Sequence, residues 1–591
     1  MSGLVGFLDP NRPPAQARQQ LERMSTSLTR GGSRRDPPLI SPPIYATCAH
    51  DERASSAILP FQSDGRYLWL DGEIFNREEL CRRLHLKASS DPELLIALID
   101  LEPVAFSHLR QLDGIFSAVL YDSRSRRVQL LTDRYGLRPL YWGLHDGRLI
   151  WCSEVKSFRE LPGFPLTVDR TALNQFFGIG YLLEDRTWLE AVRLLPAATV
   201  LTWDPSGAAF EQRQYWSWND IQPLRGRLDL HELAEHLGVL FMDAVRLRCH
   251  EGERIGLTLS GGLDSRAVLA AVPEEVDPLH TATFGQRDCA DIQIAARVAR
   301  LRGAHHHVFE ITPDNWWSPR ADGVWWTDGQ LNLMHMHSIH LVGWVEPFYR
   351  INLHPFAGDL ILGGSYLSAA QLNRSPLEVF PQLLVGLRRA NPLYDPAALA
   401  EQLHAVVSRY NSLDAFWLQN RVRRFTLNGP LCFEAALLDR KPTYDNRLIE
   451  FCLALPQELR YQGRIYHRML LHCFPDYYRS IPWQKTGLPI TAGRWRSGLK
   501  RRTDKLRAHL RDRWPVLLRN DYSDYDCWTR VDPGRAWIQN TLLNPAAHWR
   551  QYLPADRARK LLDGHFSDGR LDSEGVLLLM TFELFLRRLL D

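Results

Sequence analysis

The stretch from residue 255 to residue 272, which reads IGLTLSGGLDSRAVLAAV, constrains the fold of this chain more than any other. The apolar run at 255–259 predicts a short buried strand, and residues 264–272 predict the start of a helix. The Ser-Gly-Gly segment between them lets the backbone turn tightly from one element into the next. The stretch therefore predicts a strand, a tight turn and a helix in direct succession.

The turn has the chemistry of a nucleotide-phosphate site. Glycines let the backbone approach a phosphate, and the first amides of a new helix are unpaired donors at the positive end of its dipole. Ser260 and Ser265 add hydroxyls, and the carboxylate of Asp264 can hold magnesium beside a polyphosphate. A Walker A loop is excluded, because it needs four residues between its glycines and a Lys-Ser/Thr pair, whereas this loop has no lysine. Taken alone, the stretch is also compatible with an ordinary structural turn.

Length and composition bound the class of protein. At 591 residues the chain exceeds what one hydrophobic core usually supports, so we expect two or more domains. The 71 Lys and Arg residues nearly balance 68 Asp and Glu, so charge gives no argument for a nucleic-acid or membrane partner. The start lacks a secretion signal, no apolar run approaches membrane-spanning length, and the nine cysteines include no CxxC pair. We therefore expect a cytoplasmic protein without a disulfide framework or a zinc site.

Two patterns divide the chain near residue 216. Before this point, β-rich runs end at turn residues, such as the Asp-Gly pair at 71–72. From about residue 230, strands alternate with longer helices, which predicts a parallel sheet covered on both faces. Residues 217–229 are the expected linker. The elements expected before the boundary are strands at 67–70, 116–121 and 128–131 and helices at 77–84 and 92–101.

Several segments, in order, carry a family resemblance. They are MSGLVGF at 1–7, LDGEIFN at 70–76, SSDPELL at 89–95, LDGIFSAVLYD at 112–122, DRYGLRPLYWG at 133–143 and SEVKSF at 153–158. Together they resemble the N-terminal glutaminase domain of asparagine synthetases, and residues 281–312 continue the resemblance into the synthetase domain. The resemblance implies an α+β domain of the N-terminal nucleophile hydrolase type, glutaminase-like and degenerate, at residues 1–216. An α/β PP-loop ATP pyrophosphatase domain, the synthetase domain, is then expected at residues 217–591.

The same resemblance implies the synthetase site. SGGLDS resembles the PP-loop of ATP pyrophosphatases, which split ATP between its α and β phosphates, so ATP and Mg²⁺ are the expected cofactors and adenylation of a carboxylate is the expected chemistry. Asp359 matches a metal-binding aspartate that would act with Asp264, and Lys485, in IPWQKTG at 481–487, matches the catalytic lysine. Such a lysine can offset charge that develops in the transition state. The residues expected to contact ATP or pyrophosphate are Leu259, Ser260, Gly261, Gly262, Asp264, Ser265, Phe284 and Gly358.

The first domain departs from the family where its chemistry should be. The family's nucleophile is an N-terminal cysteine, whereas this chain has Ser2, a much weaker nucleophile near neutral pH. Asp71 replaces an amide donor, and residues 30–33 retain little of a basic binding segment. Asp91, which matches a glutamine-binding acid, is expected to remain for structural reasons. We therefore predict a scaffold that has lost ammonia production.

The synthetase domain departs at one position, three residues before Asp359. Asparagine synthetases have glutamate there and β-lactam synthetases have tyrosine, but this chain has Phe356, which cannot accept a proton. The chain therefore resembles the remaining branch of the family, the lasso peptide cyclases. These enzymes adenylate an Asp or Glu side chain of a precursor peptide and form a macrolactam with its N-terminal amine. A β-lactam synthetase-like or ammonia-using asparagine synthetase remains an alternative, as does a non-catalytic peptide-binding scaffold.

A cyclase of this kind implies partners and a large cleft. The partners implied by the resemblance are the precursor peptide, a leader-binding protein and a leader peptidase. The Trp pairs at 316–317 and 325–326 and the run at 334–337 could line a peptide cleft or belong to the core. Residues 305–307 are three histidines that we expect in ordinary structure, since consecutive residues diverge on a strand. An amphipathic packing helix is expected at 576–590.

Overall fold

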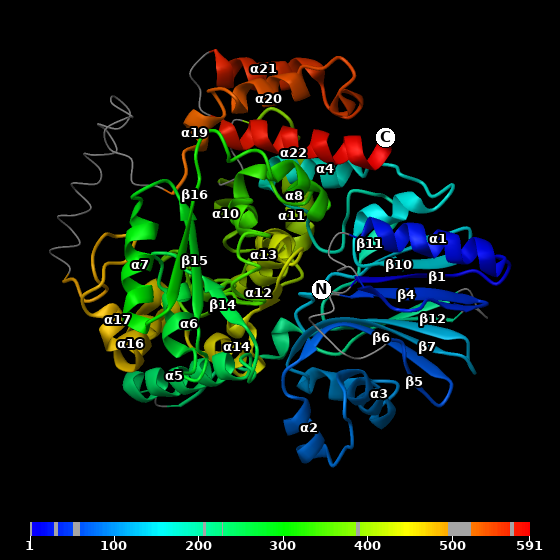
Figure 1. Cartoon of the computed structure of the whole chain (residues 1–591), viewed down its shortest axis with the longest axis horizontal. Coiled ribbons are helices and arrows are strands. Elements are labelled where there is room, and N and C mark those ends of the chain that lie inside the picture. The colour runs from blue at the N-terminus through cyan, green and yellow to red at the C-terminus, as the bar shows by residue number, and fades with distance from the viewer. Residues whose placement is uncertain are drawn as a thin grey trace.

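The chain folds into an antiparallel β-sandwich, a parallel α/β unit and a helical cap, as the computed structural model in Figure 1 shows. The structure describes residues 3–28, 34–50, 59–204, 209–226, 229–385, 391–493, 522–567 and 572–591. In this part of the chain, no helix has the length and apolar composition needed to cross a bilayer.

The N-terminal part stacks two antiparallel sheets between helices (Figure 1). The first sheet has the order β11-β9-β10-β1-β4-β2, with β3 on β4, and the second has the order β13-β12-β8-β7-β6-β5. The strands of the first sheet are β1 Gly3–Leu8, β2 Arg34–Arg35, β3 Leu39–Ser41, β4 Ile44–His50, β9 Tyr141–His145, β10 Arg148–Cys152 and β11 Val192–Leu194. Those of the second are β5 Phe61–Ser63, β6 Arg66–Ile74, β7 Gly114–Asp122, β8 Arg127–Thr132, β12 Thr199–Asp204 and β13 Ala209–Gln214. The helices are α1 Pro14–Ser27, α2 Arg77–Leu84, α3 Asp91–Leu101 and α4 Arg170–Ile179.

Alternating side chains explain why both sheets are covered on both faces. In β1, Leu4 and Leu8 point into the core between the sheets, whereas Val5 and Phe7 pack with residues of α1. In β6, Trp69 points between the sheets, and its neighbours pack toward α3. A strand whose two faces are both apolar has to lie between two layers, so the result is a four-layered α-β-β-α sandwich.

The C-terminal part is built on a five-stranded parallel sheet with the order β16-β15-β14-β17-β18. Its strands are β14 Ile255–Thr258, β15 His280–Gly285, β16 His305–Glu310, β17 Ile351–Leu353 and β18 Leu438–Arg440. Leu257 packs with the helices α5 Leu230–Arg246, α6 Asp264–Ala271 and α7 Ala290–Arg302. On the other face a Cβ at Gly256 would lie 2.4 Å from the ring of Tyr349, so only glycine admits that ring. The order in which successive strands join the sheet reverses between β14 and β17, and ligands of such sheets bind at the carboxyl ends of the strands beside this point.

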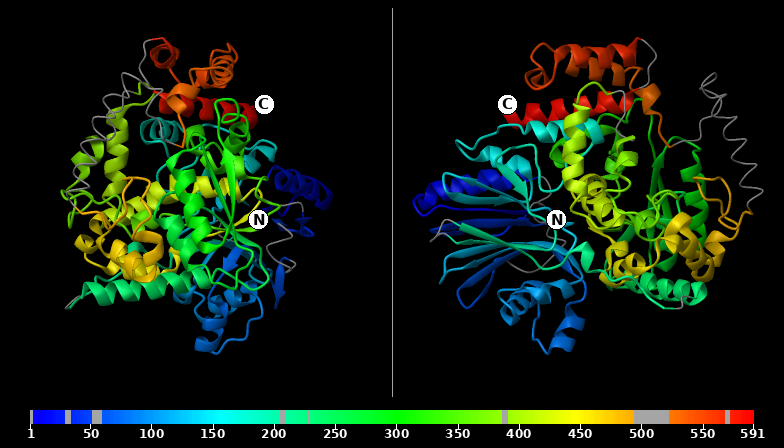
Figure 2. Two further views of the ribbon diagram at one scale, coloured as in Figure 1. Left: turned by 60° about the vertical axis from the view of Figure 1, so that its left-hand side comes forward. Right: turned by 180° about the vertical axis from the view of Figure 1, so that it is seen from behind.

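Further helices complete the C-terminal part and its cap (Figure 2). They are α8 Arg320–Trp326, α9 Gly358–Ile361, α10 Phe380–Val385, α11 Pro396–Val407, α12 Leu413–Phe416, α13 Asn428–Phe433, α14 Asn446–Ala454, α15 Gln457–Arg460, α16 Arg464–Cys473, α17 Pro475–Tyr478, α19 Tyr525–Trp528, α20 Gly534–Leu542, α21 Ala555–Phe566 and α22 Ser573–Leu590. The segment Trp417–Thr426 is a π-helix.

The C-terminal helix α22 is more buried than the expected amphipathic pattern. Glu583 is fully buried, accepts a hydrogen bond from the backbone N–H of Trp549 at 2.9 Å and pairs with Arg587. The reason is that α20 and α21 lie over the outer side of α22, as Figure 1 shows. A helix covered in this way can keep a charged residue only if that residue is paired.

The predicted strands and helices of both parts are confirmed, with one correction at the Asp-Gly pair. We expected a turn at Asp71 and Gly72, but β6 continues through both residues to Ile74. Gly72 has φ +127°, and a Cβ there would lie 2.0 Å from the carbonyl oxygen of Ile115. The glycine therefore serves close approach of two strands rather than a reversal of the chain.

Buried cations join the two parts of the chain. The Arg138 guanidinium lies between Asp71 of β6, at 2.7 Å, and Glu434 of the C-terminal part, at 2.8 Å. Arg248 reaches Asp113 at 3.1 Å, and Lys156 reaches Asp328 at 3.2 Å. Both of these cations are fully buried. A buried charge is tolerated when it is paired and hydrogen-bonded, so each of these pairs depends on both parts being present.

Replacing Arg138 with Ala should destabilise the protein strongly. The substitution removes the guanidinium from between two buried carboxylates, and breaking a buried pair costs ~3–5 kcal/mol. The urea midpoint, followed by tryptophan fluorescence, should fall accordingly. The matched control is Arg127→Ala, which removes an exposed guanidinium 2.8 Å from Asp204 and should cost less than ~1 kcal/mol. Equal decreases in the urea midpoint for the two variants would show that Arg138 does not stabilise the contact between the two parts.

Candidate functional site

The glycine turn that we predicted to be a phosphate loop lies at the carboxyl end of β14, between this strand and α6. The Ser260 and Ser265 hydroxyls are 3.0 Å apart, and the Gly262 N–H donates to the Ser260 hydroxyl at 3.2 Å. The Gly261 N–H donates to Asp291 at 2.8 Å, so this amide is occupied by a neighbouring carboxylate. A Cβ at Gly261 would lie 2.7 Å from Cβ of Gln484, which explains why this position needs glycine.

Two carboxylates meet next to this loop. Asp264 begins α6, and Asp359 lies in the first turn of α9, which follows β17. A Cβ at Gly358 would lie 3.3 Å from the carboxyl carbon of Asp264. The Tyr466 hydroxyl of α16 donates to Asp264 at 2.7 Å. The neighbouring strands β14 and β17 therefore bring the two predicted metal ligands to one place.

The electrostatics of this pair fit a divalent cation. Burial, and then the negative charge of Asp359, raise the pKa of Asp264 to about 7. Two oxygen-donor groups that repel one another lose this conflict when Mg²⁺ and phosphate oxygens lie between them. The donor set therefore suits Mg²⁺, which prefers oxygen ligands.

Lys485 lies at the rim of the phosphate loop. The segment 481–487 is bound to that loop, because the Gln484 N–H donates to the Gly261 carbonyl at 3.1 Å. Arg266 donates to the carbonyls of Gly261 at 3.1 Å and of Pro482 at 2.8 Å, which ties the two segments together. Lys485 itself is exposed, and its ammonium lies 5.6 Å from the centre of the Trp483 ring. The predicted lysine thus belongs to the same loop cluster and is open to a substrate.

A cavity of about 410 Å³ lies beside the loop and is large enough for a nucleoside. Its wall combines the predicted residues Leu259, Ser260, Ser265 and Phe284 with Thr258, Thr283, Asp291, His335, His337, Ser338, His354, Pro355, Thr426, Gly429, Pro430, Phe433, Gln484 and Tyr522. Phe284 stacks with His337, and the Tyr522 hydroxyl lies 3.1 Å from the same imidazole. Burial lowers the pKa of His337 well below its usual range, so this ring is uncharged and offers an aromatic face.

The predicted peptide wall is only partly at this site. His335 and His337 of the 334–337 run line the cavity. Trp316 instead is fully buried near Tyr525 and Trp528. Trp325 packs against Phe585 of α22. The tryptophan pairs therefore belong to the core beneath the cap, and the sequence could not distinguish a core tryptophan from a ligand-binding one.

Sequence reasoning missed an aromatic surface next to Asp359. Tyr366 follows the Gly363–Gly364 turn, and its ring centre lies 5.5 Å from that of Trp417. Trp417 begins the π-helix that ends at Thr426 in the nucleotide-sized cavity. Segments of this helix type occur often at functional sites. No sequence signal marked this segment, because a π-helix has no pattern of its own that we could have used.

Phe356 is a core residue beneath the Asp359 turn. Its ring is 1% exposed and packs 5.2 Å from the Tyr444 ring, and its carbonyl accepts a hydrogen bond from the Thr443 hydroxyl at 2.5 Å. The Lys441 ammonium lies 5.9 Å from the Phe356 ring and 2.8 Å from Asp439. The side chain at this position is therefore a packed core group with no atom that can accept a proton.

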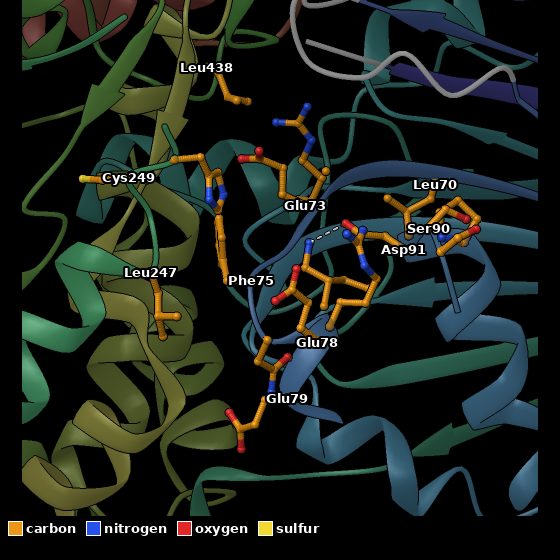
Figure 3. A pocket seen from close by; sticks show the side chains of 18 of the residues that line it. Leu70, Glu73, Phe75, Glu78, Glu79, Ser90, Asp91, Leu247, Cys249 and Leu438 are labelled. Atoms are coloured by element: carbon orange, nitrogen blue, oxygen red, sulfur yellow. Dashed lines mark hydrogen bonds and ion pairs between the residues drawn. The ribbon is translucent and has the colours of Figure 1, made fainter. Parts of the chain in front are cut away.

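A second cavity, of about 870 Å³, lies between the first domain and the C-terminal part, which contributes Leu247, Cys249 and Leu438 to its wall (Figure 3). Asp91 lies on its wall, where it accepts hydrogen bonds from the Ile74 N–H at 2.9 Å and from Arg77 at 2.7 Å. Glu73 is paired with Arg440 of the synthetase domain at 2.7 Å. Ser2 and residues 30–33 lie outside the described residues. Asp91 is thus held by an arginine of its own domain, whereas Glu73 is held by an arginine of the C-terminal part.

The comparisons with known proteins agree with this two-part architecture. Residues 1–216 match the family model of the glutamine amidotransferase domain, and residues 236–430 match the model of asparagine synthase. A glutamine-hydrolyzing asparagine synthetase of Mus musculus is 31% identical over 261 residues, which is 41% of this chain and 43% of the relative. A second one, from Bacillus subtilis (strain 168), is 32% identical over 306 residues, which is 49% of this chain and 39% of the relative. The alignments thus span less than half of either relative.

Among solved structures, the glutamine phosphoribosylpyrophosphate amidotransferase from B. subtilis, complexed with ADP and GMP, covers 52% of this chain and 90% of its own at 12% identity. Its TM-score of 0.28 is too low to carry an argument. The family models confirm the expected fold: a glutamine amidotransferase domain precedes a PP-loop asparagine synthase domain.

Replacing Asp264 with Asn should stabilise the ligand-free protein above neutral pH. The pKa of about 7 in the folded protein exceeds the value near 3.9 of an unfolded chain, so the wild type loses stability as pH rises between these values. Asn carries no charge, and we expect a gain of ~1–3 kcal/mol at pH 8 and a smaller gain at pH 5. Melting temperatures at both pH values test this.

Asp359→Asn is the matched control, since Asp359 is exposed and should change the melting temperature less. Equal or lower stability of Asp264→Asn at pH 8 would show that the carboxylate is not under strain from burial.

Proposed function

We propose that this chain, which joins a glutamine amidotransferase domain to an asparagine synthase domain, is an ATP-dependent amide-forming ligase that releases AMP and pyrophosphate. We further propose that it is a lasso peptide cyclase, whose substrate is a precursor peptide. The observation that carries the ligase activity is the meeting of Asp264, Asp359 and the phosphate loop beside a nucleotide-sized cavity.

The proposed reaction has two steps. A carboxylate oxygen of an Asp or Glu side chain attacks the α-phosphorus of ATP, and the bond from that phosphorus to the pyrophosphate oxygen breaks. The N-terminal amine of the same peptide then attacks the acyl carbon, the bond to AMP breaks, and the new amide nitrogen loses a proton. The turn at Gly262 and the start of α6 bind the departing pyrophosphate, and Lys485 offsets the charge that develops on phosphate and acyl oxygens. Bound Mg²⁺ supplies the charge that Asp264 and Asp359 need in order to lie together.

Two observations, one in the first domain and one at Phe356, support an amine that belongs to the same molecule as the activated carboxylate. Arg138 pairs with Asp71, and Arg440 pairs with Glu73. These two carboxylates are therefore already occupied and are not available to bind glutamine. Phe356 cannot accept a proton. An amine in the same molecule as the acyl group needs no ammonia supply, because holding the two reacting groups together replaces a bimolecular encounter.

The surface beside Asp359 supports a peptide as the substrate. Tyr366 and Trp417 form an aromatic wall, and Arg421, on the same π-helix, lies with its guanidinium 3.7 Å from the centre of the Phe425 ring. Aromatic and cationic side chains of this kind bind extended peptides with little loss of their own freedom. The partners that follow from this proposal are the precursor peptide, a leader-binding protein and a leader peptidase.

Lys485→Ala should abolish cyclisation while the fold remains intact. Removing one group that stabilises transition-state charge costs ~10²–10³ in kcat. The protein is incubated with ATP, Mg²⁺ and a leader-processed precursor peptide; pyrophosphate release and loss of one water from the peptide mass are the measurements. Lys560→Ala, which removes an exposed lysine of α21, is the matched control and should behave as wild type.

Three results would contradict the proposal in different ways. Formation of ADP instead of AMP would contradict cleavage of ATP between its α and β phosphates. Turnover with aspartate and ammonia alone would show that the substrate is a small molecule and not a peptide. Pyrophosphate release that is equal in Lys485→Ala and wild type would remove the assignment of the lysine.

The purified protein should release no ammonia from glutamine. Arg138 holds Asp71 and Arg440 holds Glu73, and Ser2 is a weak nucleophile, so the glutamine amide should be neither bound nor attacked. A coupled assay for ammonia, with and without ATP and peptide, measures this directly. Ammonia release that Ser2→Ala abolishes would show that the glutaminase is active.

A further inference from the structure

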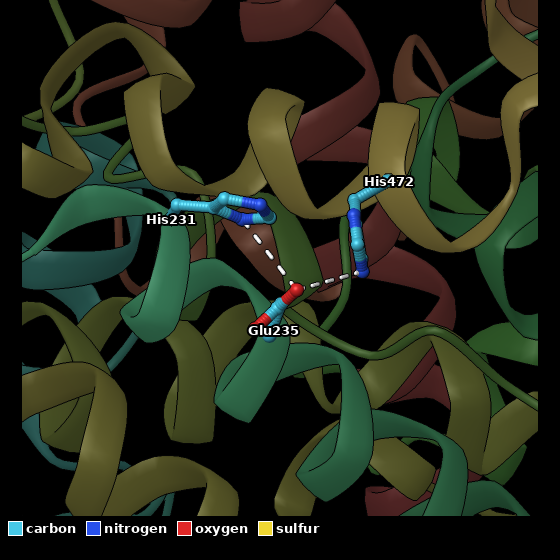
Figure 4. A group of neighbouring side chains, drawn as sticks. All are labelled: His231, Glu235 and His472. Atoms are coloured by element: carbon cyan, nitrogen blue, oxygen red, sulfur yellow. Dashed lines mark ion pairs between the residues drawn. The ribbon is translucent and has the colours of Figure 1, made fainter.

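Three metal-ligating side chains converge on the surface, away from the nucleotide cavity. His231 and Glu235 lie one turn apart on α5, so they share one face of that helix, and His472 lies in the last turn of α16. Figure 4 shows the two imidazoles pointing at the carboxylate of Glu235 from opposite sides. All three ligand atoms lie within 4.8 Å of one another.

The packing of the two helices fixes this arrangement. A Cβ at Gly238, one turn after Glu235, would lie 2.3 Å from Sγ of Cys473. The helices therefore approach closely at Gly238 and Cys473, next to Glu235 and His472, and this approach requires a glycine. The close contact leaves little freedom for α16 to slide along α5, so the distances between the ligating atoms follow from the fold.

The distances suit a shared metal ion better than hydrogen bonds. The His231 Nδ1 atom lies 3.7 Å and the His472 Nε2 atom lies 3.5 Å from the same oxygen, Oε1 of Glu235. Both distances exceed the usual range of about 2.7–3.2 Å for a hydrogen bond. Ligands at about 2.0–2.1 Å from a tetrahedral zinc ion lie about 3.3–3.4 Å apart, which is close to both values. The imidazole planes are 71° apart, so the rings do not stack and present their edges to the carboxylate.

The donor chemistry indicates which ion would bind. Two imidazole nitrogens and one carboxylate oxygen are ligands for zinc and similar divalent transition metals, whereas Mg²⁺ prefers oxygen alone. The three side chains are 45–53% exposed, so water can complete the coordination.

We propose that His231, Glu235 and His472 bind a divalent transition-metal ion of the zinc class, and that this ion joins α5 to α16. The site is independent of the proposed ligase activity. It has a structural consequence for that activity, because α16 also carries Tyr466, whose hydroxyl holds Asp264. The ion would thus brace the helix behind the phosphate loop.

The test is zinc binding to chelator-treated protein in the absence of ATP, measured by calorimetry on wild type and variants. Wild type should bind one more equivalent of Zn²⁺ than His472→Ala, and Glu235→Gln should weaken that equivalent at least about tenfold. His250→Ala, which removes an exposed histidine elsewhere, and Glu232→Gln, which changes an exposed acid on the same helix, are the matched controls and should bind as wild type.

Two further measurements make the outcome decisive. Zn²⁺ should raise the melting temperature of wild type and of both controls, but not that of His472→Ala. Co²⁺ in place of Zn²⁺ should give a visible absorption band in wild type that is lost in Glu235→Gln. Equal stoichiometry and affinity in wild type, His472→Ala and Glu235→Gln would overturn the proposal and leave only ordinary surface ion pairs.

Discussion

The pairing of buried arginines with acids across the domain boundary is the interaction on which the rest of the structure depends. Arg138 and Arg440 each contact acids from both parts of the chain, and Arg248 reaches Asp113 from the synthetase side. A buried guanidinium without its carboxylates is strongly destabilising, so separation of the two parts would leave charges either exposed or buried without a partner.

These pairs give a physical reason why the first domain would persist even after the loss of ammonia production that we propose. The first domain supplies Glu73, which pairs with Arg440 of β18, and Asp113, which pairs with Arg248. Loss of the whole domain would remove these two carboxylates and leave both buried guanidinium groups with fewer acidic partners.

The sequence predicted the fold well and the site in part. The parallel sheet, the phosphate loop and the pair of carboxylates follow from apolar runs, glycines and the order of the family's segments, all of which are local in sequence. The continuation of β6 through Asp71 and Gly72 did not, because a glycine that permits close strand approach looks the same as a glycine in a turn. The aromatic surface of Tyr366 and Trp417 was missed for a similar reason. Its two residues are 51 positions apart, and only the π-helix brings them together.

Phe356 has a consequence for how the rate would vary with acidity. A benzyl group neither gains nor loses a proton, so nothing at that position would impose its own titration on the attack of the amine. The amine would have to be unprotonated when it arrives. The midpoint and steepness of the dependence of rate on pH would then be set by the amine of the peptide. Two precursors that differ only in their first residue would be processed by one protein with two different profiles.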